Sequence, residues 1–109
     1  MIGSGYRFMW LLAMFDLPVD TPQARRHYTQ FRKALLKGGF TRLQYSVYVR
    51  HCASEESADV HTQRVRAFLP PDGEVRLLAI TDKQYGRMQV YWGKMRKPTE
   101  TPPRQLELF

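Results

Sequence analysis

Asp16 is the residue of this sequence with the clearest potential for chemistry, because its carboxylate follows directly on a long apolar run. Residues 6–15 read YRFMWLLAMF, and the chain continues as DLPVD through residues 16–20. If the apolar run is a strand, Asp16 lies at its carboxyl end, where ligand sites of open sheets commonly form. One carboxylate supplies few ligands to a divalent ion, so metal chemistry here requires further residues or a second chain.

Two interpretations of Asp16 stay open from its spacing alone. In the first, it binds magnesium, either with Asp20, Thr81 and Asp82 as neighbours or with the Asp16 of a second copy across a dimer axis. Such an ion polarises a phosphodiester and lowers the pKa of a bound water, which is the general route to metal-assisted hydrolysis. In the second, Asp16 is a turn residue whose carboxylate accepts hydrogen bonds from backbone N–H groups.

A second set of candidate residues combines cations with aromatic rings. The chain has 17 Lys and Arg against 10 Asp and Glu, a net charge of +7, which attracts polyanions. The candidate nucleic-acid-binding residues are Arg25, Arg26, Arg32, Lys33, Arg42, Tyr48 and Arg50, with Tyr45 and His51 interleaved. Arginines bind phosphate and tyrosine rings stack on bases, although an ordinary solvated surface has a similar composition. Net charge and placement together favour nucleic acid as the partner.

The remaining reactive residue types form no recognisable site. His27, His51 and His61 lack the spacing of a zinc site, and the single Cys52 excludes both an internal disulfide and a site of paired cysteines. A chain with one cysteine fits a reducing compartment. The apolar run is too short to span a bilayer and the N-terminus lacks the features of a secretory signal, which predicts a cytoplasmic location without membrane contact.

The elements that must position these residues can be predicted from the hydrophobic pattern. With 43% hydrophobic residues in 109, the chain is long enough for one modest core. The predicted elements are strands over 6–15, 40–51, 75–80 and 88–92, a helix over 21–37 and a helix from 54 to about 69. Thr21 and Ser54 are the predicted helix caps, and Gly38-Gly39 end the first helix.

This order predicts a ferredoxin-like α+β sandwich, with two helices on one face of a mainly antiparallel sheet. The other face is left bare, so we expect a homodimer that buries it. Residues 1–94 form the predicted domain, and the prolines after residue 97 predict an extended connector over 95–109. Its end is a candidate edge strand for binding a partner protein, carried by Gln105, Leu106, Leu108 and Phe109.

Several segments resemble CRISPR-associated protein 2: FDLP after the first strand, GGF after the first helix, then RLQYSVYVR and LLAITDKQY. The similarity covers about Tyr6 to Trp92, and the GYRFMW start and QLELF end are similar to the branch that accompanies type II systems. The resemblance implies a ferredoxin-like homodimer in which Asp16 of each subunit binds a shared Mg²⁺, for endonuclease activity on RNA or DNA. It also implies nucleic-acid contacts by Arg25, Arg26 and Arg42, and by the ring of Tyr48, where many relatives have phenylalanine.

The same resemblance implies a role in the spacer-acquisition complex. There the homodimer bridges two dimers of the integrase CRISPR-associated protein 1 and holds double-stranded DNA by its backbone, which requires contacts from Arg and Lys and no catalysis by Asp16. Two alternatives stay open: a toxin-like endoribonuclease of the virulence-associated D family, and a non-catalytic RNA-binding module of ferredoxin-like fold.

Overall fold

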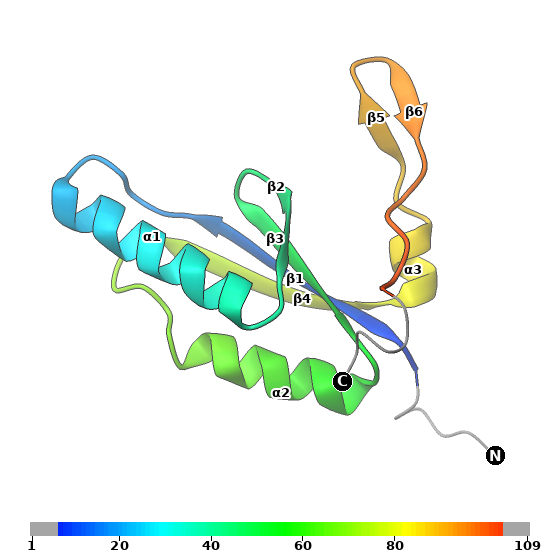
Figure 1. The fold of residues 1–109 in the computed structure, drawn as a ribbon, viewed down its shortest axis with the longest axis horizontal. Coiled ribbons are helices and arrows are strands. Elements are labelled where there is room, and N and C mark those ends of the chain that lie inside the picture. The colour runs from blue at the N-terminus through cyan, green and yellow to red at the C-terminus, as the bar shows by residue number, and fades with distance from the viewer. Residues whose placement is uncertain (1–6, 104–109) are drawn as a thin grey trace.

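Four antiparallel strands and two long helices form the body of the molecule (Figure 1), in a computed structural model that describes residues 7–103. The elements are β1 (Met9–Asp16), α1 (Pro22–Lys37), β2 (Thr41–Gln44), β3 (Val47–Cys52), α2 (Glu55–Arg66), β4 (Glu74–Thr81), α3 (Asp82–Gly86), β5 (Val90–Trp92) and β6 (Met95–Lys97). The strand order β2-β3-β1-β4 with both long helices on one face is a ferredoxin-like α+β sandwich, as predicted.

The two long helices begin where the sequence predicts. The Thr21 side chain accepts a hydrogen bond from the backbone N–H of Ala24 at 3.0 Å, and Ser54 caps α2 in the same way. Phe31 and Leu35 of α1 are buried against the sheet. Helix α2 ends at Arg66 and leaves Leu69 half-exposed, so the prediction that this helix continues to about residue 69 was wrong.

Strand β1 is central and is buried on both faces. Its odd-numbered residues, from Met9 to Phe15, pack with α1 and α2 in one core cluster. The even-numbered Trp10 and Leu12 pack on the other face with Val49 and Tyr85, where the Trp10 and Tyr85 rings stack with their centres 3.9 Å apart. This second face is only partly covered, because Leu78 of β4 is 49% exposed on it. The sheet therefore keeps a partly bare apolar face, as expected.

The segment 40–51 is a hairpin and not the single strand that its alternation predicts. Strands β2 and β3 pair antiparallel, with Gln44 opposite Val47 and a turn at Tyr45 and Ser46. Strand β3 then pairs with β1, and its Tyr48 and Arg50 lie opposite Ala13 and Leu11 on the helix-covered face. Tyr48, which is predicted to bind nucleic acid, is therefore buried under the helices.

The chain after β4 also differs from the prediction. Thr81 and Gln84 form a capping box that begins the short helix α3, where the sequence predicts a simple link. Among the described residues 7–103, strand β5 pairs with β6 alone, in a two-stranded sheet. Met95–Lys97 is thus a strand, although the nearby prolines predict a connector. The predicted edge strand at residues 105–109 lies outside the described residues. Across residues 7–103, no helix has both the length and the apolar composition needed to cross a membrane.

Candidate metal and nucleic-acid site

The Asp16 side chain is exposed at the last position of β1. Because side chains alternate along a strand, Asp16 lies on the same face as Trp10, Leu12 and Met14, away from α1 and α2. This is the partly bare apolar face of the sheet. The carboxylate thus lies at the end of an exposed apolar surface.

Glu74 is the nearest acidic partner that the sheet gives to Asp16, and the sequence analysis did not identify it. The register of β1 and β4 places the two residues directly opposite each other, a position in which Cβ atoms are about 4.5–5.5 Å apart. The Glu74 carboxylate also accepts a hydrogen bond from Arg76 Nε at 2.8 Å, and this contact lowers the pKa of Glu74. The only signal for Glu74 in the sequence was an acidic residue directly before the predicted strand 75–80, and strand pairing was needed to interpret it.

Thr81 and Asp82, two of the neighbours proposed for Asp16, lie at the opposite end of the sheet. Thr81 pairs with Met9 at the start of β1, seven positions away from Asp16. Asp82 accepts a hydrogen bond from Trp10 Nε1 at 2.6 Å. Thr81 is the N-cap of α3, and Asp82 is the first residue of this helix. The expectation that they share a site with Asp16 is therefore wrong.

A metal site at Asp16 would have oxygen ligands, which are the ligands that Mg²⁺ prefers. One chain brings Asp16 and Glu74 together there, and Glu74 is already paired with Arg76. Within residues 7–103, no group of three or more His, Cys, Asp or Glu side chains is arranged to hold a metal ion. The donor set fits magnesium in type, and phosphate, water or a second chain would have to supply its remaining ligands.

The turn between β2 and β3 lies at the same end of the sheet as Asp16. The backbone N–H of Phe15 donates a hydrogen bond to the Ser46 carbonyl at 3.0 Å, which joins the turn to the end of β1. The Tyr45 side chain is 69% exposed on this turn, and the Arg42 guanidinium lies 5.1 Å from the centre of its ring. Burial and a hydrogen bond to Tyr45 raise the pKa of Tyr28 on α1. An exposed ring with an adjacent cation is therefore close to the acidic residues.

Tyr48, the predicted stacking residue, is placed differently. It is 1% exposed, and the centre of its ring lies 5.6 Å from the centre of the Phe15 ring inside the helix-covered core. A buried ring has no free face for a nucleic-acid base, so the expectation that Tyr48 stacks on bases is corrected. Tyr45, three residues earlier, has the exposure that such a contact requires.

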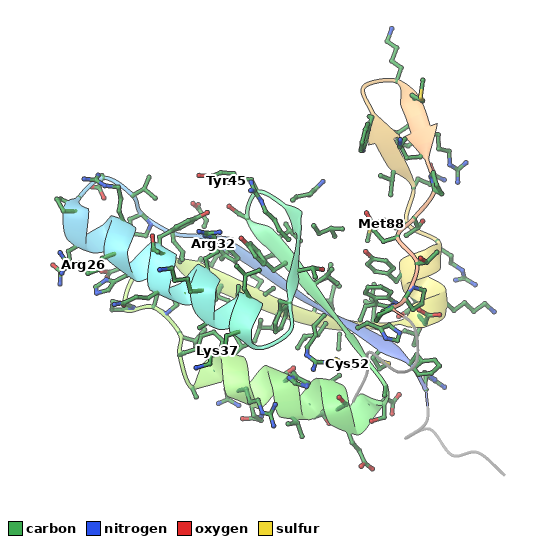
Figure 2. All side chains as sticks on the ribbon, viewed as in Figure 1. Arg26, Arg32, Lys37, Tyr45, Cys52 and Met88 are labelled. Atoms are coloured by element: carbon green, nitrogen blue, oxygen red, sulfur yellow. The ribbon has the colours of Figure 1, made fainter. Side chains whose placement is uncertain are left out.

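The predicted basic residues of α1 lie along the helix, and Figure 2 shows Arg26, Arg32 and Lys37 in this order. Arg25, Arg26 and Lys33 are exposed, and Arg32 is half-buried. The Arg25 guanidinium donates to the Val19 carbonyl at 2.9 Å and so ties the first turn of α1 to the loop after Asp16. The first turns of this helix therefore bring cations to the Asp16 end of the sheet.

Arg50 has a mainly structural position. Its guanidinium donates hydrogen bonds of 2.9 Å to the carbonyls of Gly38 and His51, and the residue is half-buried. The Gly38 contact satisfies a carbonyl at the C-terminal end of α1, where helices leave such groups without partners. The hydrogen bonds of Arg50 to the backbone thus leave it fewer free donors for a phosphate than its place in the sequence predicts.

The fold and this group of residues define a class: a ferredoxin-like domain with carboxylates, arginines and an exposed tyrosine at one end of its sheet. Residues 9–88 match the family model described as CRISPR associated protein Cas2, and the chain belongs to this family. This membership confirms the resemblance seen in the sequence.

Curated relatives that carry the name CRISPR-associated endoribonuclease Cas2 agree with this family. The protein of Parvibaculum lavamentivorans is 61% identical over 101 residues, which cover 93% of this chain and 100% of the relative. The protein of Flavobacterium psychrophilum is 48% identical over 104 residues, 95% of this chain and 90% of the relative. The protein of Paracidovorax avenae is 44% identical over 106 residues, 97% of this chain and 98% of the relative.

Proposed function

We propose that this chain is a homodimeric, magnesium-dependent endonuclease that acts on RNA, with Asp16 of each subunit at its centre. The observation that carries the proposal is the position of Asp16 at the end of the partly bare apolar face of the sheet. A two-fold axis that passes near this end of the face would bring two Asp16 carboxylates together. The choice of RNA rests on the relatives, which carry the name endoribonuclease.

In this proposal, Asp16 and Glu74 hold the ion, and the surrounding residues hold the substrate. When bound, Mg²⁺ supplies charge that polarises a phosphodiester and lowers the pKa of a water molecule. Tyr45 and Arg42 offer a stacking face and a cation to the nucleotide, and Arg26 offers a further cation to phosphates. The contact with Arg76 lowers the pKa of Glu74 and so favours the charged form of this carboxylate, which is the form that binds a cation.

The test compares wild type with Asp16→Asn in RNA cleavage with magnesium and with a chelator. We expect cleavage by wild type only with magnesium, and a loss of about 100-fold or more in Asp16→Asn, because an amide lacks the charge that holds the ion. Asp59→Asn, on the exposed side of α2, is the matched control and should cleave like wild type. Calorimetric titration with magnesium gives a second readout. Equal cleavage by Asp16→Asn and wild type would contradict the proposal.

A second role is favoured by the exposed cations of α1, which are suited to phosphate contacts without any chemistry. We propose that the homodimer also holds double-stranded DNA in the spacer-acquisition complex, between dimers of the integrase CRISPR-associated protein 1. Spacer acquisition should then persist in Asp16→Ala and fall in the double variant Arg26→Ala, Lys33→Ala. A loss of acquisition in Asp16→Ala, with the complex still assembled, would count against this role.

A further inference from the structure

Two hydrogen bonds tie the chain after β6 back to the region of α3, and Figure 1 shows the chain returning there. The Thr99 hydroxyl donates to the Met88 carbonyl at 2.9 Å. The hydroxyl of Tyr85, a buried residue of α3, donates to the Glu100 carboxylate at 2.9 Å. The described chain therefore approaches its last residue, Pro103, from a fixed point on the body of the domain.

A groove of about 470 Å³ lies between this returning segment and the β2 edge of the sheet. Glu100 and Pro103 line it from the segment, Thr41 and Leu43 line it from β2, and Trp10 and Tyr85 add aromatic surface. The strand order places β2 and β4 at opposite edges of the sheet. The groove is therefore distant from Leu78, the exposed apolar residue of β4, and one of its walls is the returning segment of the same chain.

Strand β2 can accept a further strand along its outer edge. Within residues 7–103, it pairs with β3 alone. An edge strand has backbone N–H and C=O groups without partners, and extended segments bind to such edges as an added strand. The groove thus combines a free backbone edge with apolar side chains beside it.

The two faces of β2 differ in chemistry. Thr41 is opposite Val49, and Leu43 packs in the same cluster as Val49 and Trp10, so both β2 residues lie on the groove face. Arg42, between them, is opposite Tyr48 and lies toward the other face. A strand that pairs with β2 should therefore carry apolar residues on the groove face and an acidic residue on the face of Arg42.

We propose that residues 104–109 of the same chain occupy this groove as a strand added to β2. The segment reads RQLELF, follows Pro103 directly and contains no proline that would interrupt strand pairing. At about 3.3 Å per residue, it reaches about 20 Å, whereas β2 extends about 13 Å. The segment is therefore long enough to follow all of β2 from Pro103.

The alternation of this segment matches that of β2. Leu106 and Leu108 share one face of an extended chain and would fill the groove, and Glu107 between them would lie on the side of Arg42. Opposite charges on neighbouring strands stabilise their pairing. A partner protein that binds residues 105–109 must then displace them from β2, so the groove controls access to this segment. This inference goes beyond the proposed function and requires neither Asp16 nor a metal ion.

Amide hydrogen exchange of β2 tests the proposal in the full chain and in a chain that ends at Pro103. We expect the β2 amides to exchange on the order of tenfold faster in the shortened chain, because an added strand contributes about 1.4 kcal/mol or more to their protection. The double variant Leu106→Asp, Leu108→Asp should exchange like the shortened chain. Gln105→Ser is the matched control, since Gln105 lies away from the groove face, and it should exchange like wild type.

A charge reversal tests the register of the two faces. Glu107→Arg should speed the exchange of the β2 amides, because it places two cations on neighbouring strands. Combining it with Arg42→Glu should restore the slow exchange. Asp16→Asn should exchange like wild type, so a failure of the metal proposal and a failure of this inference give different results.

A spin label on the variant Gln105→Cys distinguishes the segment of the same chain from that of a second copy. The native Cys52 is buried and is protected from the label. We expect the label to broaden the β2 resonances of an isotope-labelled chain that carries it. In an equal mixture of spin-labelled chains and isotope-labelled chains without a spin label, these resonances should stay sharp.

Two outcomes would overturn the proposal. One is equal exchange of the β2 amides in the full and the shortened chain, which would leave the edge of β2 unoccupied. The other is broadening of the β2 resonances in the mixed sample alone, which would assign the groove to residues 104–109 of a second copy.

Discussion

At the scale of single residues, two buried histidines decide how the fold responds to acid. His51 and His61 are 7% and 8% exposed. Burial lowers the pKa of both side chains, and the charges of Arg50 and Arg64 help to lower the pKa of His61 to about 4. Each histidine is therefore neutral in the folded chain at neutral pH. Protonation of either places a charge inside the protein, at a high cost in free energy.

The pH dependence of stability should follow from His61. Its pKa is near 6.5 in the unfolded chain and about 4 in the folded one, so the unfolded state binds more protons between these values. The stabilising contribution is fully present above about pH 6.5 and is lost as the pH falls toward 4. We expect thermal unfolding temperatures measured from about pH 7 to about pH 4.5 to fall less in His61→Leu than in wild type. An equal fall in both proteins would contradict this assignment.

At the scale of elements, the start of β4 is fitted closely to the end of β1. Gly73 has φ +90°, and a Cβ atom added there would lie 2.7 Å from the Asp16 carbonyl oxygen and 2.7 Å from Leu17 Cδ2. A side chain would therefore clash with the backbone of the candidate metal ligand and strain its own dihedral angles. The glycine thus lets β4 begin beside Asp16, which is what brings Glu74 opposite it.

Gly73→Ala should destabilise the fold by about 2 kcal/mol or more, because both the clash and the positive φ act against alanine. Urea unfolding measures this change. Gly86→Ala at the end of α3 is the matched control, since an added Cβ there meets no atom within 4 Å. Its stability should remain within about 0.5 kcal/mol of wild type. If both variants unfolded at the same urea concentration, the close approach at Gly73 would not contribute to the stability of the fold.

At the scale of the whole molecule, the two faces of the sheet differ in how completely they are covered. Helices α1 and α2 cover one face, whereas α3 covers only part of the other. Leu78 is 49% exposed on that second face, and Asp16 lies at its end. The proposed homodimer therefore connects the apolar surface with the candidate metal site, because both lie on the same side of the sheet.

Leu78→Glu should prevent dimerisation while the subunit stays folded, because it places a charge in the surface expected to be buried between two copies. Light scattering across a concentration series measures the mass, and circular dichroism checks the fold. Val60→Glu is the matched control, since Val60 is 47% exposed on α2 and lies away from this face. A dimer that persists in Leu78→Glu would exclude this face as the interface.

Much of the architecture was readable from the sequence because it depends on local signals. The apolar run predicted β1, and the capping residues predicted the start of both long helices. The pair of glycines predicted the end of α1. The hairpin at Tyr45 and Ser46 had no such signal, because neither residue of its turn is glycine or proline. Neither residue has positive φ, so the turn does not require a glycine. Tyr48 was misplaced for a different reason, because the alternation along β3 does not show which face of the sheet the helices cover.

For the candidate site, the sequence by itself determined the residue types: a carboxylate after a long strand, cations along a helix, and a family whose motifs are short and local. Only the tertiary structure decided which of them meet. In the structure, Glu74 lies opposite Asp16, whereas Thr81 and Asp82 lie at the far end of the sheet. Tyr45 is exposed and Tyr48 is buried. The physical reason is that strand register and burial depend on contacts between residues far apart in the chain, which local patterns do not specify.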